Sequence, residues 1–142
     1  MNIENLSQKD YENIIILWEK SVRITHTFLK ESDIETIKNA VYTTLIKIAL
    51  FGIKGSDELC GFMGASFDEI EALFVNPKYF SQGIGKNLML YAIKELHLKK
   101  VCVNEQNKNA FNFYRKFGFK IIKKDTIDPL GLPYPILHLE LT

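Results

Sequence analysis

Residues 70–96 constrain the fold of this chain more than any other segment. They begin with a short run rich in apolar, β-branched and aromatic side chains, which is typical of a buried strand. Asn76 and Pro77 end this strand, because proline has no N–H for the ladder and disfavours helix in the residue before it. Gly83 and Gly85 permit a tight turn, and an amphipathic helix follows. A strand that enters a helix through a glycine turn directs main-chain N–H groups outward at the positive end of the helix dipole. The segment therefore predicts an anion site suited to a phosphate or pyrophosphate.

The rest of the chain alternates between strand-like and helix-like patterns. Strands are expected at residues 2–6, 48–53, 59–67, 70–75, 100–104, 119–122 and 136–141. Helices are expected after Ser7, from Ser32-Asp33, from Gly85 and over residues 107–117, where Gly118 is suited to end the last one. A mixed sheet with helices on both faces is the compact arrangement for this order, so we predict an α/β (α+β) fold.

Composition narrows the class of protein. The chain has 142 residues, of which 46% are hydrophobic and 25% charged, as in a single globular domain spanning residues 1–142. Its net charge of +1 lacks the basic excess expected of a nucleic-acid binder. No apolar run reaches about 18 residues, so neither a membrane span nor a membrane partner is expected and the cytoplasm is the simplest location. Cys60 and Cys102 have no metal-ligand spacing and are expected to be small buried hydrophobes in a reducing compartment.

Three interpretations of the glycine turn compete. A P-loop fails because Asn87 follows Gly85-Lys86, where Mg²⁺ needs a hydroxyl ligand, and Phe80 occupies the position of the required earlier glycine. A dinucleotide-binding fingerprint fails because Leu88 stands where its third glycine belongs. Two glycines alone are equally compatible with an ordinary tight turn.

The surrounding residues favour a ligand site. Residues 80–85 resemble the coenzyme A-binding segment of the GCN5-related N-acetyltransferase (GNAT) family. That segment reads Gln or Arg, two variable residues, Gly, one variable residue, then Gly or Ala. Residues 107–119 resemble the family's second signature, N-x-x-A-x-x-F-Y-x-x-x-G-F. Further stretches resemble small bacterial acetyltransferases of the YjaB type, so the resemblance covers nearly the whole chain. Phe80 departs from the pattern, which leaves either a lower coenzyme A affinity or a replacement contact from Lys86 or Lys78.

The resemblance implies a mostly antiparallel sheet of about six to seven strands and the transfer of an acetyl group from acetyl-CoA to an amine, without a metal. It implies that coenzyme A is bound by Phe74, Val75, Ser81, Gln82, Gly83, Ile84, Gly85, Lys86, Asn107, Ala110, Phe113 and Tyr114. In the family, a bulged strand near Val75 offers main-chain N–H to the thioester carbonyl.

Tyr114 is the candidate general acid for the departing thiolate, because it follows Asn107 by two helical turns, about 10 Å along the axis. An ordinary core position is the alternative for Tyr114. Glu71 and His26 are candidates for the general base, with direct loss of the proton to water as a third possibility. Glu71 and Glu69 are expected to alternate with Leu73 and to share its strand face.

Other functional assignments stay open at this stage. Neither motif contains a cysteine, which favours direct transfer in a ternary complex over an acetyl-cysteine intermediate. A coenzyme A-binding sensor without catalysis is the alternative function. The acceptor is a peptide lysine or a small amine, and the chain is expected to be a monomer or a homodimer. His138 and Glu140 on the last strand are either on the substrate side or solvated, and His97 is expected to be solvated.

Overall fold

The computed structural model describes residues 2–142. The chain forms two compact units, an N-terminal unit (Met1–Leu98) and a C-terminal unit (Lys99–Thr142). The described residues form seven strands, four α-helices and two short 3-10 helices. Within each unit, neighbouring strands pair in the antiparallel direction.

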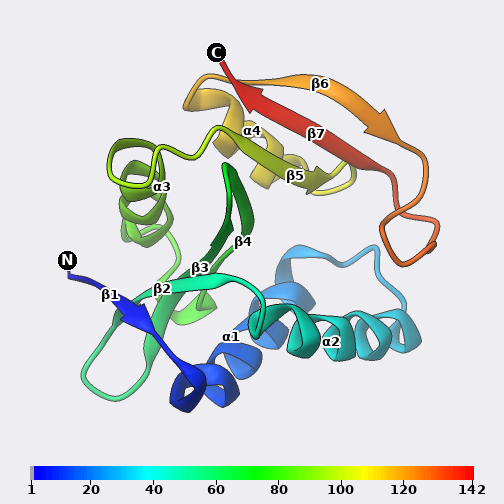
Figure 1. Cartoon of the computed structure of the whole chain (residues 1–142). Helices are drawn as coiled ribbons and strands as arrows, with labels where there is room; N and C mark the ends of the chain where they lie inside the picture. The colour runs from blue at the N-terminus through cyan, green and yellow to red at the C-terminus, as the bar shows by residue number, and fades with distance from the viewer. Residues whose placement is uncertain (1) are drawn as a thin grey trace. The chain divides into compact units, whose positions relative to one another are not determined.

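The N-terminal unit contains a four-stranded antiparallel sheet in the order β1-β2-β3-β4 (Figure 1). Its elements are β1 (Ile3–Leu6), η1 (Gln8–Asp10), α1 (Tyr11–Thr25), α2 (Glu31–Leu45), β2 (Ala49–Lys54), β3 (Leu59–Ser66), β4 (Glu69–Val75), η2 (Pro77–Tyr79) and α3 (Ile84–Lys94). A capping box precedes α1: the Ser7 N–H donates to the Asp10 carboxylate at 2.8 Å, which satisfies a donor at the helix start.

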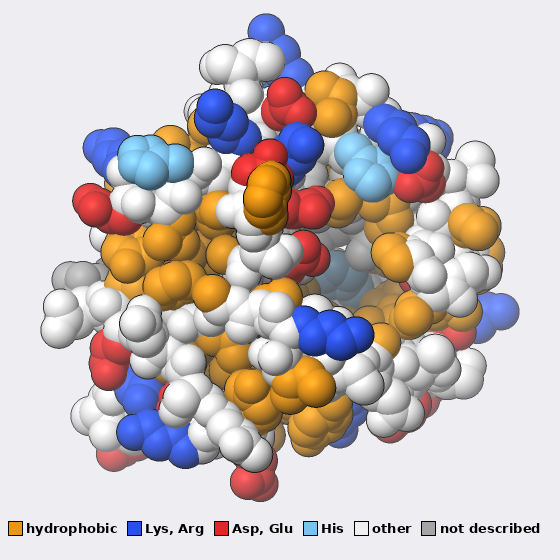
Figure 2. Space-filling model, in the orientation of Figure 1, with side chains coloured by type: hydrophobic (Ala, Val, Ile, Leu, Met, Phe, Trp, Pro, Cys, Tyr) orange, Lys and Arg blue, Asp and Glu red, His pale blue; other side chains and the backbone are white. Residues whose placement is uncertain are grey.

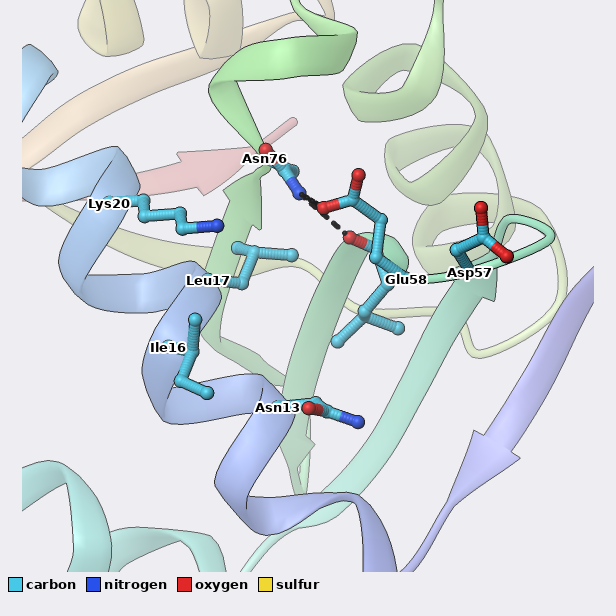
Figure 3. A pocket seen from close by; sticks show the side chains of 8 residues that line it. Asn13, Ile16, Leu17, Lys20, Asp57, Glu58 and Asn76 are labelled. Carbon is cyan, nitrogen blue, oxygen red and sulfur yellow. Dashed lines mark hydrogen bonds between the residues drawn. The ribbon is translucent and has the colours of Figure 1, made fainter.

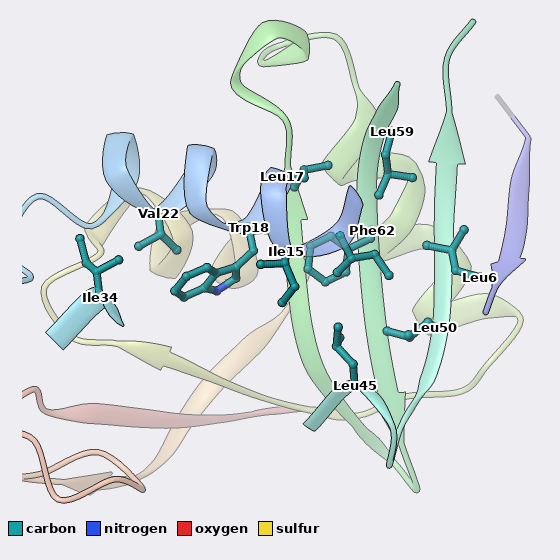
Figure 4. Close-up of a cluster of buried hydrophobic side chains, with 11 residues drawn as sticks. Leu6, Ile15, Leu17, Trp18, Val22, Ile34, Leu45, Leu50, Leu59 and Phe62 are labelled. Atoms are coloured by element: carbon teal, nitrogen blue, oxygen red, sulfur yellow. The ribbon is translucent and has the colours of Figure 1, made fainter. Parts of the chain in front are cut away.

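The two faces of this sheet are covered by different helices. Figure 4 shows a cluster of buried apolar side chains, in which Trp18 of α1 and Leu45 of α2 pack with Phe62 of β3. The neighbouring residue on β3, Gly61, faces the other way, and a Cβ added there would lie 2.5 Å from Ile84 Cγ2 of α3. Since successive strand residues point to opposite faces, α1 and α2 cover one face and α3 covers the other. The missing side chain at Gly61 allows the start of α3 to lie directly against the sheet.

Strand β4 contains an extra residue at Glu71. Gly64 pairs with Ala72, but the next residue of β3, Ala65, pairs with Ile70, so Glu71 has no opposite partner. This is a β-bulge, in which two residues of one strand face one residue of its neighbour. On the β3 side of the strand, the bulge lies at Glu71 and not near Val75, where the family resemblance predicts one, because β3 and β4 pair regularly at the Val75 end.

The C-terminal unit contains β5 (Lys100–Asn104), α4 (Lys108–Lys116), β6 (Phe119–Asp125) and β7 (Ile136–Leu141), with strand order β5-β7-β6. α4 packs against β5 and β6, and the Tyr114 ring lies 6.0 Å from the Phe119 ring. Gly118 joins α4 to β6 with φ of +102°, the left-handed conformation that glycine adopts without a Cβ penalty.

The predicted mixed, mostly antiparallel fold and its order of elements are confirmed, with small differences at the ends. β6 runs to Asp125 rather than residue 122, and α2 begins at Glu31. The prediction that both cysteines are buried is wrong for Cys102, whose strand turns Val101 and Val103 inward and Cys102 outward. The single-domain assignment stays a prediction. None of the helices in residues 2–142 is long and apolar enough to cross a membrane.

Candidate functional site

The glycine loop has a sharply turned backbone that ends at the start of α3. Ser81 has φ of +63° and Gly83 has φ of +83°, so two residues of this short loop are left-handed. Gly83 is the residue that caps α3, and its carbonyl accepts hydrogen bonds from the Asn87 main chain at 3.0 Å and the Asn87 side chain at 2.7 Å. Of the two loop glycines, Gly83 has the positive φ that glycine permits, whereas Gly85 lies within α3.

The first turn of α3 has the properties of an anion site. Main-chain N–H groups in the first turn of a helix have no acceptor within that helix, and they lie at the positive end of its dipole. The first turn carries no acidic side chain, and Lys86 and Gln82 are exposed beside it. The local geometry and charge therefore suit a phosphate group, as the sequence predicts.

Asn76 holds the end of β4 against the hairpin that joins β2 to β3. Its buried side chain donates to Glu58 Oε1 at 3.1 Å and to the Leu59 carbonyl at 3.2 Å, and it accepts from the Lys78 N–H at 3.1 Å. The Lys78 ammonium lies 2.9 Å from Glu58 Oε2, and this contact, followed by the Asn76 bond, lowers the pKa of the Glu58 carboxyl. Lys78, one of the two residues considered as a replacement for the polar side chain missing at Phe80, thus pairs with Glu58 in this structure.

A small pocket lies beside this contact (Figure 3). It has a volume of about 60 Å³ and is lined by Asn13, Ile16, Leu17, Lys20, Asp57, Glu58, Leu59 and Asn76. Ligand pockets for molecules of coenzyme size range over several hundred Å³. We therefore regard it as a packing feature next to the Asn76–Glu58 contact rather than as the candidate site.

Main-chain and side-chain groups at the end of β4 point in different directions. The Asn76 N–H donates to the Cys60 carbonyl on β3 at 2.8 Å, so the preceding N–H, that of Val75, points to the opposite edge of β4. The Phe74 ring instead packs in the core, with its centroid 5.7 Å from that of Phe62. Of these two predicted coenzyme A contacts, the Val75 N–H points away from β3, and the Phe74 side chain packs against Phe62.

His26 is buried at the end of α1 and is neutral at pH 7. Its Nδ1 lies 2.7 Å from Thr25 Oγ1, whose own hydrogen is directed to the Ser21 carbonyl at 2.8 Å. Nδ1 is therefore assigned as the donor, and Nε2 carries the lone pair. Burial lowers the pKa of His26 to about 4. Its ring lies 6.3 Å from Phe74, so the α1–α2 segment and β4 approach each other here.

Glu71 is exposed at the bulge, where its Oε1 accepts a hydrogen bond from Ser66 Oγ at 2.6 Å. Glu69 lies beyond the bulge and pairs with Ser66. The extra residue shifts the alternation, so Glu69 shares the face of Phe74 rather than that of Leu73. The expectation that both glutamates share one face with Leu73 is therefore wrong for Glu69.

The second motif forms α4 in the C-terminal unit. Asn107 caps the helix, its Oδ1 accepting from the Ala110 N–H at 3.3 Å. Tyr114 is the buried residue of this helix, and its ring contacts Phe113 and Phe119 edge-on. Burial raises the pKa of Tyr114, and negative charge on Cys102 raises it further, so the phenol is protonated at neutral pH.

A line of polar side chains crosses the sheet of the C-terminal unit. Cys102 Sγ lies 3.2 Å from His138 Nδ1, and His138 Nε2 lies 2.7 Å from Asp125 Oδ2. Each of the three residues comes from a different strand, β5, β7 and β6. We call this the Cys102–His138–Asp125 array. His138 is thus held by side chains rather than simply solvated, whereas His97 is exposed as expected.

The surface shows charges of both signs close together. In the face drawn in Figure 2, Lys and Arg side chains lie next to Asp and Glu without a broad field of one sign. Among the described residues, no group of three or more His, Cys, Asp or Glu side chains is arranged to hold a metal ion.

Two side-chain contacts could not be predicted from the sequence. The Asn76–Glu58 contact joins residues 18 positions apart, and the Cys102–His138 contact joins residues 36 apart. The only local signal was the alternation of Cys102 and His138 with apolar neighbours, which placed each on the polar face of its strand.

Comparison with known proteins agrees with this picture. The sequence profile described as acetyltransferase (GNAT) domain matches residues 47–121. A peptidyl-lysine N-acetyltransferase, YjaB of Salmonella typhimurium, is 36% identical over 140 residues, which cover 98% of this chain and 97% of that protein.

Solved structures resemble the chain over its full length. The solution structure of apo YjaB from Escherichia coli superposes with a TM-score of 0.89 at 31% identity, covering 99% of this chain and 97% of that one. The PaiA N-acetyltransferase of Thermoplasma acidophilum, crystallised with coenzyme A, gives a TM-score of 0.67 at 26% identity, covering 99% of each chain. Both motifs are present, the glycine loop and the segment that forms α4, and the chain belongs to the GNAT family of acetyltransferases.

Proposed function

We propose that this protein transfers an acetyl group from acetyl-CoA to the side-chain amine of a lysine in a protein or peptide, directly and within a ternary complex. The observation that carries the proposal is the glycine loop, whose left-handed Ser81 and Gly83 lead into the first turn of α3. That arrangement suits the pyrophosphate of coenzyme A. We further propose that the protein acts in the cytoplasm as a monomer or a homodimer.

Residues of both units would bind acetyl-CoA, the acetyl donor. The amides of residues 82–86 would bind the pyrophosphate, with Lys86 adding positive charge at an exposed position. The Val75 N–H, which points away from β3, would donate to the thioester carbonyl and stabilise the oxyanion as charge develops. Asn107 uses its oxygen as the cap of α4, so a contact with the pantetheine arm would come from its amide nitrogen.

Tyr114 is proposed as the general acid. The departing coenzyme A thiolate needs a proton, and the raised pKa of Tyr114 keeps the phenol protonated at neutral pH. The same burial gives Tyr114 a structural role, because its ring packs against Phe119. The two roles are separable by a substitution that keeps the ring.

The acceptor amine must lose a proton before it attacks, since a lysine amine with a pKa of about 10.4 is mostly protonated at neutral pH. Glu71 is an exposed carboxylate at the β4 bulge, where Ser66 orients it. His26 is buried with its pKa lowered to about 4, which makes it unprotonated but weakly basic at pH 7. Glu71 is the better-placed of the two to receive the proton, directly or through water.

A protein lysine is proposed as acceptor because the relative named above, which acts on peptidyl-lysine, matches nearly the whole chain. The balanced surface charge favours neither a strongly acidic nor a strongly basic partner. A small amine is the competing acceptor, and the same assay distinguishes the two.

The test is the release of coenzyme A thiol from acetyl-CoA by purified protein. Lysine-containing peptides and a panel of small amines are supplied in parallel, and mass spectrometry of the peptide identifies acetyl-lysine. We expect amine-dependent thiol release with acetylation of peptide lysine. Release with small amines alone would refute the protein acceptor. Tight acetyl-CoA binding without release to any amine would refute catalysis and identify a coenzyme A-binding sensor.

A further inference from the structure

The Cys102–His138–Asp125 array has the order of a thiol, a base and an orienting acid. Cys102 pairs directly with His138 in the register of β5 and β7, which brings Sγ within 3.2 Å of Nδ1. Asp125 reaches the other side of the same ring from β6, at 2.7 Å from Nε2. A nucleophile next to a base that is itself held by a third group is the general pattern of an activated side chain.

The ionised carboxylate of Asp125 determines which ring nitrogen of His138 is the hydrogen-bond donor. The bond from His138, the largest influence, lowers the pKa of the Asp125 carboxyl, and Lys123 lowers it further. An ionised carboxylate only accepts hydrogen bonds, so His138 donates from Nε2 to Asp125. In that tautomer Nδ1 carries the lone pair, and it faces Cys102 Sγ as an acceptor for the thiol proton.

The two cysteines of the chain differ in their exposure to solvent and in the side chains that they contact. Cys102 is exposed and lies against His138, whereas Cys60 is buried in β3. Burial raises the pKa of the Cys60 thiol, which disfavours its reactive thiolate form. The chain therefore contains its own inert reference thiol.

The face around the array carries charges of both signs. By the register of β5, β6 and β7, the charged side chains next to the array on this face are Lys100, Lys120, Lys123 and Glu140. Lys123 is itself 3.6 Å from Asp125. With the Asp125 carboxylate counted, three lysines face two carboxylates, and this small positive excess favours the approach of an anionic reagent.

We propose that Cys102 is a thiol-modification site that reacts with small anionic disulfides, with His138 as its base and Asp125 as the residue that positions His138. His138 Nδ1 takes the Cys102 proton, and Sγ attacks one sulfur of the disulfide. The disulfide S–S bond breaks as a new S–S bond to Cys102 forms. The departing thiolate takes the proton from the imidazolium, so the disulfide is the oxidant and no other co-reactant is needed.

The probe is oxidised glutathione, a small anionic disulfide, added to the full chain at pH 7. The rate of adduct formation is measured by intact-protein mass spectrometry, and peptide mapping locates it. We expect one glutathionyl group per chain, on Cys102, and none in Cys102→Ser. His138→Gln should react about 100-fold more slowly, the lower end of what a lost general base typically costs.

Matched controls separate reactivity from folding. Asp125→Asn keeps both Cys102 and His138 and should also slow the reaction, whereas His97→Gln, at an exposed histidine of the other unit, should react like the parent protein. Circular dichroism checks that each variant is folded. At about pH 9 and above, where thiols ionise without a base, the gap between His138→Gln and the parent should narrow. A parent-like rate at pH 7 in both His138→Gln and Asp125→Asn, or modification of Cys60 instead, would overturn the proposal.

Discussion

Asn76 Nδ2 donates to Glu58 Oε1 at 3.1 Å, and this bond ties the end of β4 to the hairpin between β2 and β3. Asn76 is 5% exposed, and its bond to the Leu59 carbonyl is buried, whereas its bond to Glu58 is only partly buried. The glycine loop begins a few residues later. The position of the loop relative to the sheet therefore depends on a side chain that is not part of either family motif.

Replacing Asn76 by alanine should lower the free energy of unfolding by about 1–3 kcal/mol, because the buried Leu59 carbonyl and the Glu58 carboxylate each lose a donor. Urea unfolding measures the loss, and calorimetric titration should show weaker binding of acetyl-CoA. Asn13→Ala is the matched control, since Asn13 lines the same pocket but is exposed. Equal stability of the two variants would contradict the role given to Asn76.

Gly61→Ala should destabilise the protein by about 1–3 kcal/mol, because the new methyl group would lie 2.5 Å from Ile84 Cγ2 and would displace the start of α3. The measurement is a double-mutant cycle with Ile84→Ala, which removes the opposing methyl group. If the clash is the cause, the double variant loses less stability than the sum of the two single variants. Strict additivity would show that Gly61 matters for another reason.

Tyr114→Phe should keep the affinity for acetyl-CoA and reduce turnover by about 100- to 10,000-fold, as expected when a general acid is lost but its ring still packs. Steady-state kinetics and titration with acetyl-CoA provide the two readouts. Tyr42→Phe removes a hydroxyl at an exposed position and should leave both unchanged. Unchanged turnover in Tyr114→Phe would remove this residue from the chemistry.

The titration of His26 should appear in the pH dependence of stability. Its pKa is lowered from 6.5 to about 4 in the folded protein, so the unfolded chain takes up the proton first as the pH falls. Protonation of His26 therefore leaves the free energy of unfolding unchanged above about pH 6.5. As the pH falls from 6.5 through 4, it lowers the free energy of unfolding by about 3 kcal/mol in total. Unfolding in urea between pH 7.5 and 4 should show this extra loss in the parent and in His97→Gln, but not in His26→Gln. A parent-like slope in His26→Gln would show that His26 does not titrate in this way.

The general base is identified by pH–rate profiles. Glu71→Gln should lower kcat/KM and remove the limb of the profile that reflects deprotonation of the base, while His26→Ala should retain that limb. Glu69→Gln, on the other strand face, is the matched control. A limb that disappears in His26→Ala and persists in Glu71→Gln would reverse the assignment, and persistence in both would favour water.

Local chemistry made much of the fold predictable. Ser7 with Asp10, Asn76 with Pro77, and Gly118 each act within a few residues of their position, so their effect is visible in the sequence. The two glycine-containing motifs were predictable for the same reason. The candidate residues in them stay predictions, because only chemistry on the protein itself assigns their roles.

The features that the sequence could not show depend on register between strands. The bulge at Glu71 is one extra residue against β3, and it moved Glu69 to the other face without any turn signal. Cys102 meets His138 only because β5 and β7 pair at that register, and Asp125 reaches His138 because β6 continues past its expected end. An apolar alternation predicts which side of a strand is polar, and pairing decides which polar groups meet.

The two left-handed residues of the glycine loop, Ser81 and Gly83, affect how binding is divided between enthalpy and entropy. We expect the fold itself to impose these backbone angles, so that the conformational entropy of the loop is lost during folding. Little ordering then remains for an incoming pyrophosphate to impose, and more of each hydrogen bond is retained as affinity. Coenzyme A fragments that contain only the pyrophosphate end should for that reason bind with a small entropic penalty, which calorimetry would measure directly.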